Sequence, residues 1–308
     1  MTKTFALKLL RPNGAHAVVG VPYAWLLLFF ALPFLIVLRI SFSEMEAVRV
    51  GDIFNYSDGT LSLRLRVANY LFLGQDDLYL RAYLSSLRYA ALTTIGCLAI
   101  GYPFAYFMAR SKPSHQPLLM MLVMLPFWTS FLLRVYAWKV LLSPGGWVAT
   151  PIHALGLDRL LAALGLIEAP GLLMHTPFSL LVGMVYTYLP FMVLPLYATL
   201  SKLDVRLLEA AADLGATPWS TFWRITVPLS RRGIVAGAML VFIPCVGEYV
   251  TPELLGGPRT LMIGRVLWDE FFGNNDWPLA SAIAVLLCLL VLLPMALYNR
   301  AQAEEARP

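Results

Sequence analysis

The chain has 308 residues, of which 59% are hydrophobic and only 13% are charged, and its formal net charge is +5. Soluble domains carry about 25% charged residues, so this chain lacks the polar surface that a water-soluble protein needs. The same composition excludes a disordered protein and, despite the positive charge, a basic nucleic-acid binder. The sequence therefore predicts an integral membrane protein.

Six apolar stretches have the length of roughly 20 residues that a helix needs to cross the hydrocarbon core. We therefore expect an all-α protein with six transmembrane helices in a single membrane domain, residues 1–308. The first stretch follows Lys3, Lys8 and Arg11 and is too long for a cleaved signal peptide, so we expect it to remain as the first span. The predicted spans are residues 21–40, 83–108, 117–142, 176–200, 234–250 and 278–298.

The cysteines and histidines show no pattern of a metal site or a catalytic centre. Cys97, Cys245 and Cys288 stand singly in apolar stretches, without a CxxC spacing. The histidines form no HExxH pair, and the chain has no GxSxG nucleophile motif. The GxxxxGK[ST] phosphate loop is also missing, so the chain cannot hydrolyse ATP by itself. We expect a protein that is not an enzyme, with no catalytic residue and no metal.

Lysine and arginine residues gather on one side of the predicted spans. Six spans place both chain ends on the same side, which carries more basic residues than the opposite side. By the positive-inside rule this side is cytoplasmic, so we expect both termini in the cytoplasm. Its basic residues are Lys3, Lys8, Arg11, Arg110, Lys112, Lys202, Arg206, Arg224, Arg231, Arg232, Arg300 and Arg307. The opposite side carries Arg49, Arg64, Arg66, Arg81, Arg159, Arg259 and Arg265.

The cytoplasmic loop of residues 201–230, between the fourth and fifth spans, has the pattern of two short helices. Residues 205–214 are rich in helix formers, and Gly215 suits the left-handed position that ends a helix. Thr217 can cap a second helix that has Pro218 in its first position. The pattern predicts a compact helix-turn-helix that is exposed to the cytoplasm.

This loop resembles the EAA loop of the permease subunits of bacterial ABC importers. Glu209-Ala210-Ala211 precedes Gly215, and Ile225 follows at the expected spacing. The resemblance implies a type I importer permease (MetI-like) architecture, in which the loop docks in a groove of a separate ATPase subunit. It implies that Glu209 is the acidic contact, that the two alanines allow close approach and that Gly215 makes the turn. Two ATPase copies would then bind ATP and Mg, and this chain would bind no cofactor.

The end of the fifth span and the last outer loop combine carboxylates with aromatic rings. Glu248 lies at the end of the span, where an unpaired charge costs at least about 2.5 kcal/mol. Charge pairing together with aromatic faces is what an organic ammonium ligand requires. The alternative is an interfacial aromatic belt in which Glu248 pairs with Arg134 or Lys139. The candidate substrate-pathway residues are Glu248, Tyr249, Glu253, Trp268, Asp269, Glu270, Asp276 and Trp277.

The segments 246–258 and 125–138 resemble the permeases of bacterial polyamine ABC importers, above all the putrescine-type permease, and the similarity runs from Pro22 to Tyr298. It implies ATP-driven import of putrescine, spermidine or both across the bacterial inner membrane by alternating access. The implied partners are two ATPase subunits, a second, unlike permease, a periplasmic polyamine-binding protein and membrane lipid, with no nucleic acid. Two alternatives stay open: a permease for an oxyanion or ferric ion, and an ion-driven secondary carrier.

Overall fold

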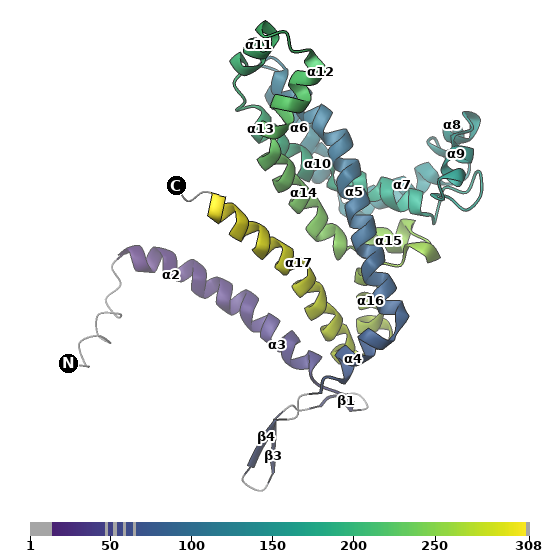
Figure 1. Ribbon diagram of the computed structural model, residues 1–308. Coiled ribbons are helices and arrows are strands. Elements are labelled where there is room, and N and C mark those ends of the chain that lie inside the picture. The colour runs from purple at the N-terminus through teal and green to yellow at the C-terminus, as the bar shows by residue number, and fades with distance from the viewer. Residues whose placement is uncertain (1–13, 47–48, 52–53, 58–59, 64–65, 306–308) are drawn as a thin grey trace, which may run out of the picture. The chain divides into compact units, whose positions relative to one another are not determined.

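The computed structural model describes residues 14–46, 49–51, 54–57, 60–63 and 66–305. The chain divides into two compact units (Figure 1). The first unit joins Met1–Asp76 to Asp269–Pro308, and the second is Asp77–Trp268. Lys3, Lys8, Arg11, Arg64 and Arg307, which the sidedness prediction uses, lie outside the described residues.

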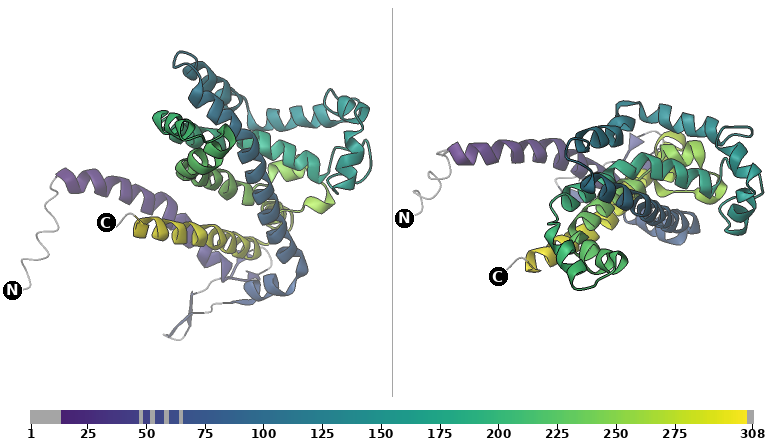
Figure 2. Two further views of the ribbon diagram at one scale, coloured as in Figure 1. Left: turned by 45° about the horizontal axis from the view of Figure 1, so that its top comes forward. Right: turned by 90° about the horizontal axis from the view of Figure 1, so that it is seen from above.

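The first unit is built on two long apolar helices. Helix α2 (Gly14–Leu26), the π-helical turn η1 (Leu27–Ala31) and α3 (Leu32–Ser41) follow one another without a break. The other long helix is α17 (Trp277–Glu305), which follows η5 (Asp269–Gly273) and lies beside α3 (Figures 1 and 2). From Val18 to Ile40 the side chains are mostly apolar and exposed, as expected of a helix that contacts lipid or other helices of a membrane complex.

Short elements that the sequence analysis does not predict follow α3. Strands β1 (Met45–Glu46) and β2 (Arg49–Val50) form one antiparallel pair, and β3 (Phe54–Ser57) and β4 (Thr60–Leu63) form another. Helix α4 (Ala68–Gln75) is held to the end of α3, because the Asn69 amide donates hydrogen bonds of 3.0 Å to the carbonyls of Ser41 and Ser43. These hairpins lie outside the predicted spans, where edge strands are not exposed to lipid.

The core of the second unit is a packed group of three helices: α5 (Asp77–Arg110), α10 (Pro177–Leu200) and α14 (Arg231–Val246) (Figure 2). Met192 of α10 lies between glycines of the other two helices. A Cβ atom at Gly101 would lie 3.2 Å from Met192 Cγ, and one at Gly237 would lie 2.8 Å from Met192 Sδ. Membrane helices pack closely where small residues let the backbones approach. The apolar cysteines fit this core, since Cys97 and Cys245 are fully buried.

Two predicted spans are broken. The third consists of α6 (Gln116–Met124) with the 3-10 turn η2 (Leu125–Trp128) and α7 (Phe131–Leu142), and its two halves meet at 90°. The break follows Pro126, whose ring disfavours a continuous helix. In the fifth predicted span, residues 234–250, the helix α14 ends at Val246, and residues 247–249 are not helical.

Short helices lie on either side of α14. They are α11 (Arg206–Asp213), α12 (Pro218–Thr221), η3 (Phe222–Thr226) and α13 (Val227–Leu229) before it, and α15 (Val250–Leu255), η4 (Pro258–Thr260) and α16 (Ile263–Trp268) after it.

Three helical stretches of the described chain are long and apolar enough to cross a membrane alone: Val18–Ser41, Asp77–Arg110 and Pro177–Leu200. The number rises to five if each bent pair is one span, the second pair being the helices before and after Ser230, which meet at 66°. Within α17, Trp277–Leu292 is a shorter apolar helix. The division into six spans stays a prediction.

The segment between α7 and α10 folds into two small helices, α8 (Ala149–Ala154) and α9 (Leu157–Ala163). Asp158 is buried, and its carboxylate lies 2.6 Å from His153 Nδ1 and accepts a hydrogen bond of 2.9 Å from the Arg159 N–H. The hydrogen bond with His153 and then that of Arg159 hold the pKa of Asp158 below its usual value, although burial acts in the opposite direction. The apolar core of the segment is Leu142, Ala149, Ile167 and Leu173.

A lowered carboxyl pKa predicts that the α8–α9 segment loses stability in acid. The stabilisation is present above the unfolded-state pKa of about 4 and is lost as the pH falls below it, through the folded-state pKa. The hydrogen-exchange protection factors of residues 149–163, which are corrected for the intrinsic pH dependence of exchange, should therefore fall below about pH 4. Asp158→Asn should lower these protection factors already at neutral pH and flatten their pH dependence. Asp77→Asn, in an exposed ion pair, is the control and should change neither.

Candidate functional site

The helix-turn-helix predicted for residues 201–230 is present, and a glycine turn joins its first two helices. α11 begins at Arg206 rather than at residue 205, and Asp204 accepts a hydrogen bond of 3.0 Å from the Arg206 N–H. Gly215 has φ +80°, and its N–H donates a hydrogen bond of 2.8 Å to the Ala212 carbonyl. The Ala216 N–H donates a hydrogen bond of 2.9 Å to the Ala211 carbonyl. This is a Schellman motif, in which the residue with positive φ is usually glycine.

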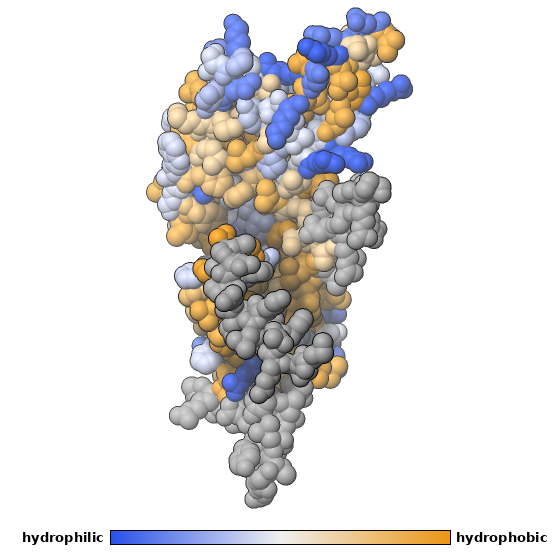
Figure 3. Space-filling model, turned by 90° about the vertical axis from the view of Figure 1, so that its left-hand side faces the viewer, coloured by the Kyte–Doolittle hydropathy of each residue, from blue (hydrophilic) through white to orange (hydrophobic). Residues whose placement is uncertain are grey.

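The predicted loop residues differ in exposure. Glu209, Ala210 and Gly215 are exposed, Ala211 is buried and Ile225 is half-buried. The same loop exposes large apolar side chains, with Leu214 at 89% and Trp219 at 71% of their full surface. On the face drawn in Figure 3, hydrophilic side chains gather at the end of the molecule that carries this loop. Exposed apolar side chains in a polar surrounding are typical of a protein–protein contact.

An aromatic cluster that the sequence analysis did not single out anchors the loop on α5. The Phe222 ring meets the Tyr102 ring edge-on at 5.5 Å and the Tyr106 ring at 6.2 Å. Tyr102 also forms a buried hydrogen bond of 2.8 Å with Ser230, the residue directly before α14. The two tyrosines are four residues apart, so they lie on one face of α5. This spacing is the feature of the sequence from which the aromatic cluster could have been predicted. The loop is therefore held against α5 immediately before α14 begins.

Glu248 lies in the turn between α14 and α15, not inside a helix. Its Oε2 accepts a hydrogen bond of 2.5 Å from the Tyr188 hydroxyl, and its Oε1 accepts bonds from the Thr251 N–H at 3.3 Å and the Thr251 hydroxyl at 3.4 Å. Tyr188 is buried midway along α10, so Glu248 lies level with the middle of a helix long enough to cross a membrane. An ionisable residue at that depth is a functional-site candidate.

The break in the third predicted span lies beside this carboxylate site. The Phe127 ring packs edge-on against Phe191 at 5.0 Å, and Phe191 lies 6.1 Å from the Tyr188 ring. The Arg134 guanidinium lies over the Phe127 ring at 5.5 Å. In the described part of the chain, neither Arg134 nor Lys139 forms an ion pair with Glu248. The pairing that the alternative interpretation requires is therefore not formed here.

The segment after Glu248 turns back on itself and brings two aromatic residues together. Tyr249 and Trp268 stack at 4.5 Å with an angle of 9° between their planes. Gly264 lets α16 lie close to the backbone of the Glu248 turn. A Cβ atom at this position would be 2.4 Å from the Gly247 carbonyl oxygen and 2.6 Å from the Glu248 carbonyl oxygen.

Glu253, another predicted carboxylate, has a cationic partner. Its Oε2 lies 2.7 Å from Arg265 Nε, so its charge is largely compensated within the protein. Glu248, by contrast, has no ion pair with any residue that the structure describes. Of the predicted carboxylates in the second unit, Glu248 is therefore the one available to pair with a cationic ligand.

The other four predicted residues belong to the first unit. The Asp276 carboxylate accepts the Leu279 N–H at 3.0 Å and caps α17, which is a structural role. Glu270 accepts a hydrogen bond of 2.8 Å from the Asn274 side chain. The Trp277 ring lies 6.3 Å from Phe271, and the carbonyl of Asp269 accepts the Asn274 N–H at 2.9 Å. The site formed within the second unit thus contains Glu248, Tyr249, Trp268 and Tyr188.

Broken helices around a carboxylate in the middle of the packed helices, together with an exposed helix-turn-helix, are features of a membrane permease subunit. The chain belongs to the family of binding-protein-dependent transport system inner membrane components, whose sequence profile matches residues 100–303. The predicted all-α importer-permease fold is confirmed, with β1 to β4 as small additions outside the spans. Membership of this family decides against an ion-driven secondary carrier.

Characterised relatives and a solved structure agree with this assignment. The chain is 38% identical to the spermidine/putrescine transport system permease protein PotB of Haemophilus influenzae, over 96% of both chains. It is 39% identical to PotB of Escherichia coli K12, over 90% of this chain and 94% of the relative. The crystal structure of a bacterial alginate ABC transporter, in complex with a periplasmic protein that holds an alginate pentasaccharide, contains a chain with TM-score 0.66, 18% identity and 97% coverage of both chains.

The close approach of α16 to the Glu248 turn predicts the effect of a single methyl group. Gly264→Ala should lower the thermal unfolding midpoint of the purified complex, because overpacking of this kind costs about 1–3 kcal/mol. Gly74→Ala is the matched control, since a Cβ at Gly74 meets nothing within 4 Å. Equal midpoints for both variants would show that α16 does not depend on this contact.

Proposed function

We propose that this chain is a permease subunit of an ATP-driven ABC importer that moves polyamines, putrescine or spermidine or both, across the bacterial inner membrane. The observation that carries the proposal is the Glu248 carboxylate, which lies level with the middle of α10 and has no cationic partner in the described chain. The names of the two PotB relatives support the same solute class.

The chemistry of the site suits an alkylammonium ion. Protonated amines carry positive charge and hydrogen-bond donors, and Glu248 supplies a carboxylate that Tyr188 and Thr251 hold in place. Tyr249 follows Glu248 directly in the chain, and its ring stacks with that of Trp268. A cation over the face of such a ring gains about 0.5–2 kcal/mol. When an amine leaves, the Tyr188 hydroxyl still satisfies the carboxylate, which lowers the energy of the empty site.

The energy for transport comes from partner subunits. We propose that the loop with Glu209, Ala210, Ala211, Gly215 and Ile225 docks in a groove of an ATPase subunit, two copies of which bind ATP and Mg. The exposed Leu214 and Trp219 would enter the apolar part of that contact. This chain then has no catalytic activity of its own, and the protein lacks the phosphate loop that ATP binding would require.

The remaining partners and the orientation follow from the same scheme. A second, unlike permease completes the membrane pathway, and a periplasmic polyamine-binding protein delivers the solute. The basic residues around the docking loop (residues 201–230) support a cytoplasmic position for the loop and for both termini. Alternating access then requires that the loop and the Glu248 turn move together, and α14 connects them directly.

The proposed amine contact is tested with Glu248→Gln. Without the negative charge, uptake of labelled putrescine by the reconstituted complex should fall at least about tenfold, the loss expected for one charge-assisted contact. Asp77→Asn is the control, because that carboxylate is exposed and paired with Arg81. If uptake falls only in proportion to the amount of inserted protein, the role of Glu248 is structural. Competition by unlabelled putrescine and spermidine would then show whether the complex binds polyamines at all.

The docking loop is tested at its turn. Gly215→Val places a β-branched side chain at φ +80°, which such residues rarely adopt, and should abolish the ATPase stimulation by the loaded binding protein. Gly215→Asn is the matched variant and should keep a larger part of the stimulation, because asparagine tolerates this conformation. Full stimulation with valine, in a complex that still assembles, would contradict the coupling role of the turn.

A further inference from the structure

A polar cavity lies beside α5, in the half of the helix away from the docking loop. Its volume is about 210 Å³. α5 contributes Arg88, Tyr89 and Leu92, and η4 contributes Arg259. Leu181 of α10 forms part of an apolar wall. The whole lining belongs to the second unit, and it combines two guanidinium groups with aliphatic side chains.

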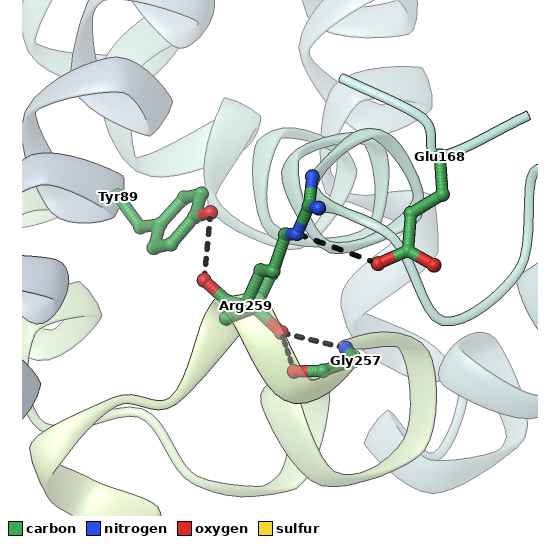
Figure 4. Close-up of polar contacts among 5 residues, drawn as sticks. Tyr89, Glu168, Gly257 and Arg259 are labelled. Carbon is green, nitrogen blue, oxygen red and sulfur yellow. Dashed lines mark hydrogen bonds and ion pairs between the residues drawn. The ribbon is translucent and has the colours of Figure 1, made fainter. Parts of the chain in front are cut away.

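Among the described residues, positive charge exceeds negative charge around this cavity, because Arg88 and Arg259 face the single carboxylate of Glu168. The Arg88 group lies 6.0 Å from the centre of the Tyr89 ring, and Arg88 has no ion pair with a described residue. Arg259 Nε has a single contact of 3.5 Å with Glu168, and its other guanidinium nitrogens point away from that carboxylate (Figure 4). The Tyr89 hydroxyl donates a hydrogen bond of 3.4 Å to the Arg259 carbonyl, which holds η4 against α5. An anionic ligand would balance the charge.

The position of Arg88 along α5 indicates where that ligand comes from. Arg88 falls in the first turns of the predicted span 83–108, and the apolar side chains Leu84, Leu92 and Ile95 are exposed on the same helix. With Arg88 between Leu84 and Leu92, successive members are four, four and three positions apart, so all four residues lie on one stripe of the helix. Arg88 is only five residues from the start of the predicted span, and the long side chain of an arginine near a span end extends to the level of the lipid head groups. A free anion would use the guanidinium groups but not the apolar stripe.

We infer that this cavity binds the phosphate of an anionic phospholipid, in the leaflet opposite the docking loop. The forked donors of Arg88 and Arg259 match phosphate oxygens, and the acyl chains lie along Leu92 and Ile95. The cavity favours an anion over a polyamine, because the two guanidinium groups outweigh the one carboxylate of Glu168. The lipid would hold α5, the start of α10 and η4 together, independently of which solute the complex transports.

The test uses the complete complex, delipidated in detergent and titrated with phosphatidylglycerol while bound lipid is counted by native mass spectrometry. Arg88→Gln should weaken lipid binding by about tenfold, as expected for one charge-assisted contact. Arg159→Gln removes the same charge from a residue outside the cavity lining and should bind as the wild type does. Arg88→Lys keeps the charge and should bind more lipid than Arg88→Gln does.

Three results would overturn the inference. Equal lipid binding by Arg88→Gln and Arg159→Gln would show that this cavity does not bind the lipid phosphate. Displacement of the lipid by inorganic phosphate at an equal concentration would identify a site for free anions. If Arg88→Gln instead releases the second permease or the binding protein while lipid binding stays unchanged, the cavity is a protein interface.

Discussion

The hydrogen bond from Tyr188 to Glu248 is the contact on which the arrangement of the second unit depends. It joins the middle of α10 to the turn after α14, at a depth where a carboxylate without a partner is expensive. Met192 packs against Gly101 and Gly237 one turn further along α10 and sets how closely the three helices approach. Gly264 then brings α16 against the backbone of the same turn. A polar group is thus held in place by close packing of apolar and small residues.

Helix α14 connects the two candidate sites physically. It begins directly after Ser230, which is bonded to Tyr102 beside the docking loop, and it ends two residues before Glu248. A helix of 16 residues is about 24 Å long and moves as one body on the scale of a domain movement. α14 is therefore a direct physical connection between the loop and the carboxylate turn. The helices before and after Ser230 meet at 66°, so the chain changes direction between the loop and α14.

Sequence patterns predicted most of the apolar helices and the helix-turn-helix, since both depend on local properties. Hydrophobic length marks a span, and glycine after a helix former marks the turn at Gly215. The partners of Glu248 were not predictable, because Tyr188 is 60 positions away and no local pattern links them. The neutralisation of Glu253 by Arg265 and the capping role of Asp276 were missed for the related reason that composition counts charges but does not pair them.

The sequence by itself determined the class of this protein, because a chain with 13% charged residues and long apolar runs is stable only in a membrane. It also determined the position of the docking loop, whose turn is fixed by residues within a few positions of one another. Only the tertiary structure decided that Glu248 and not Glu253 stays without a cationic partner, and where two predicted spans break. Those features depend on contacts between distant helices, and it is packing in three dimensions, not local propensity, that sets the cost of burying a charge.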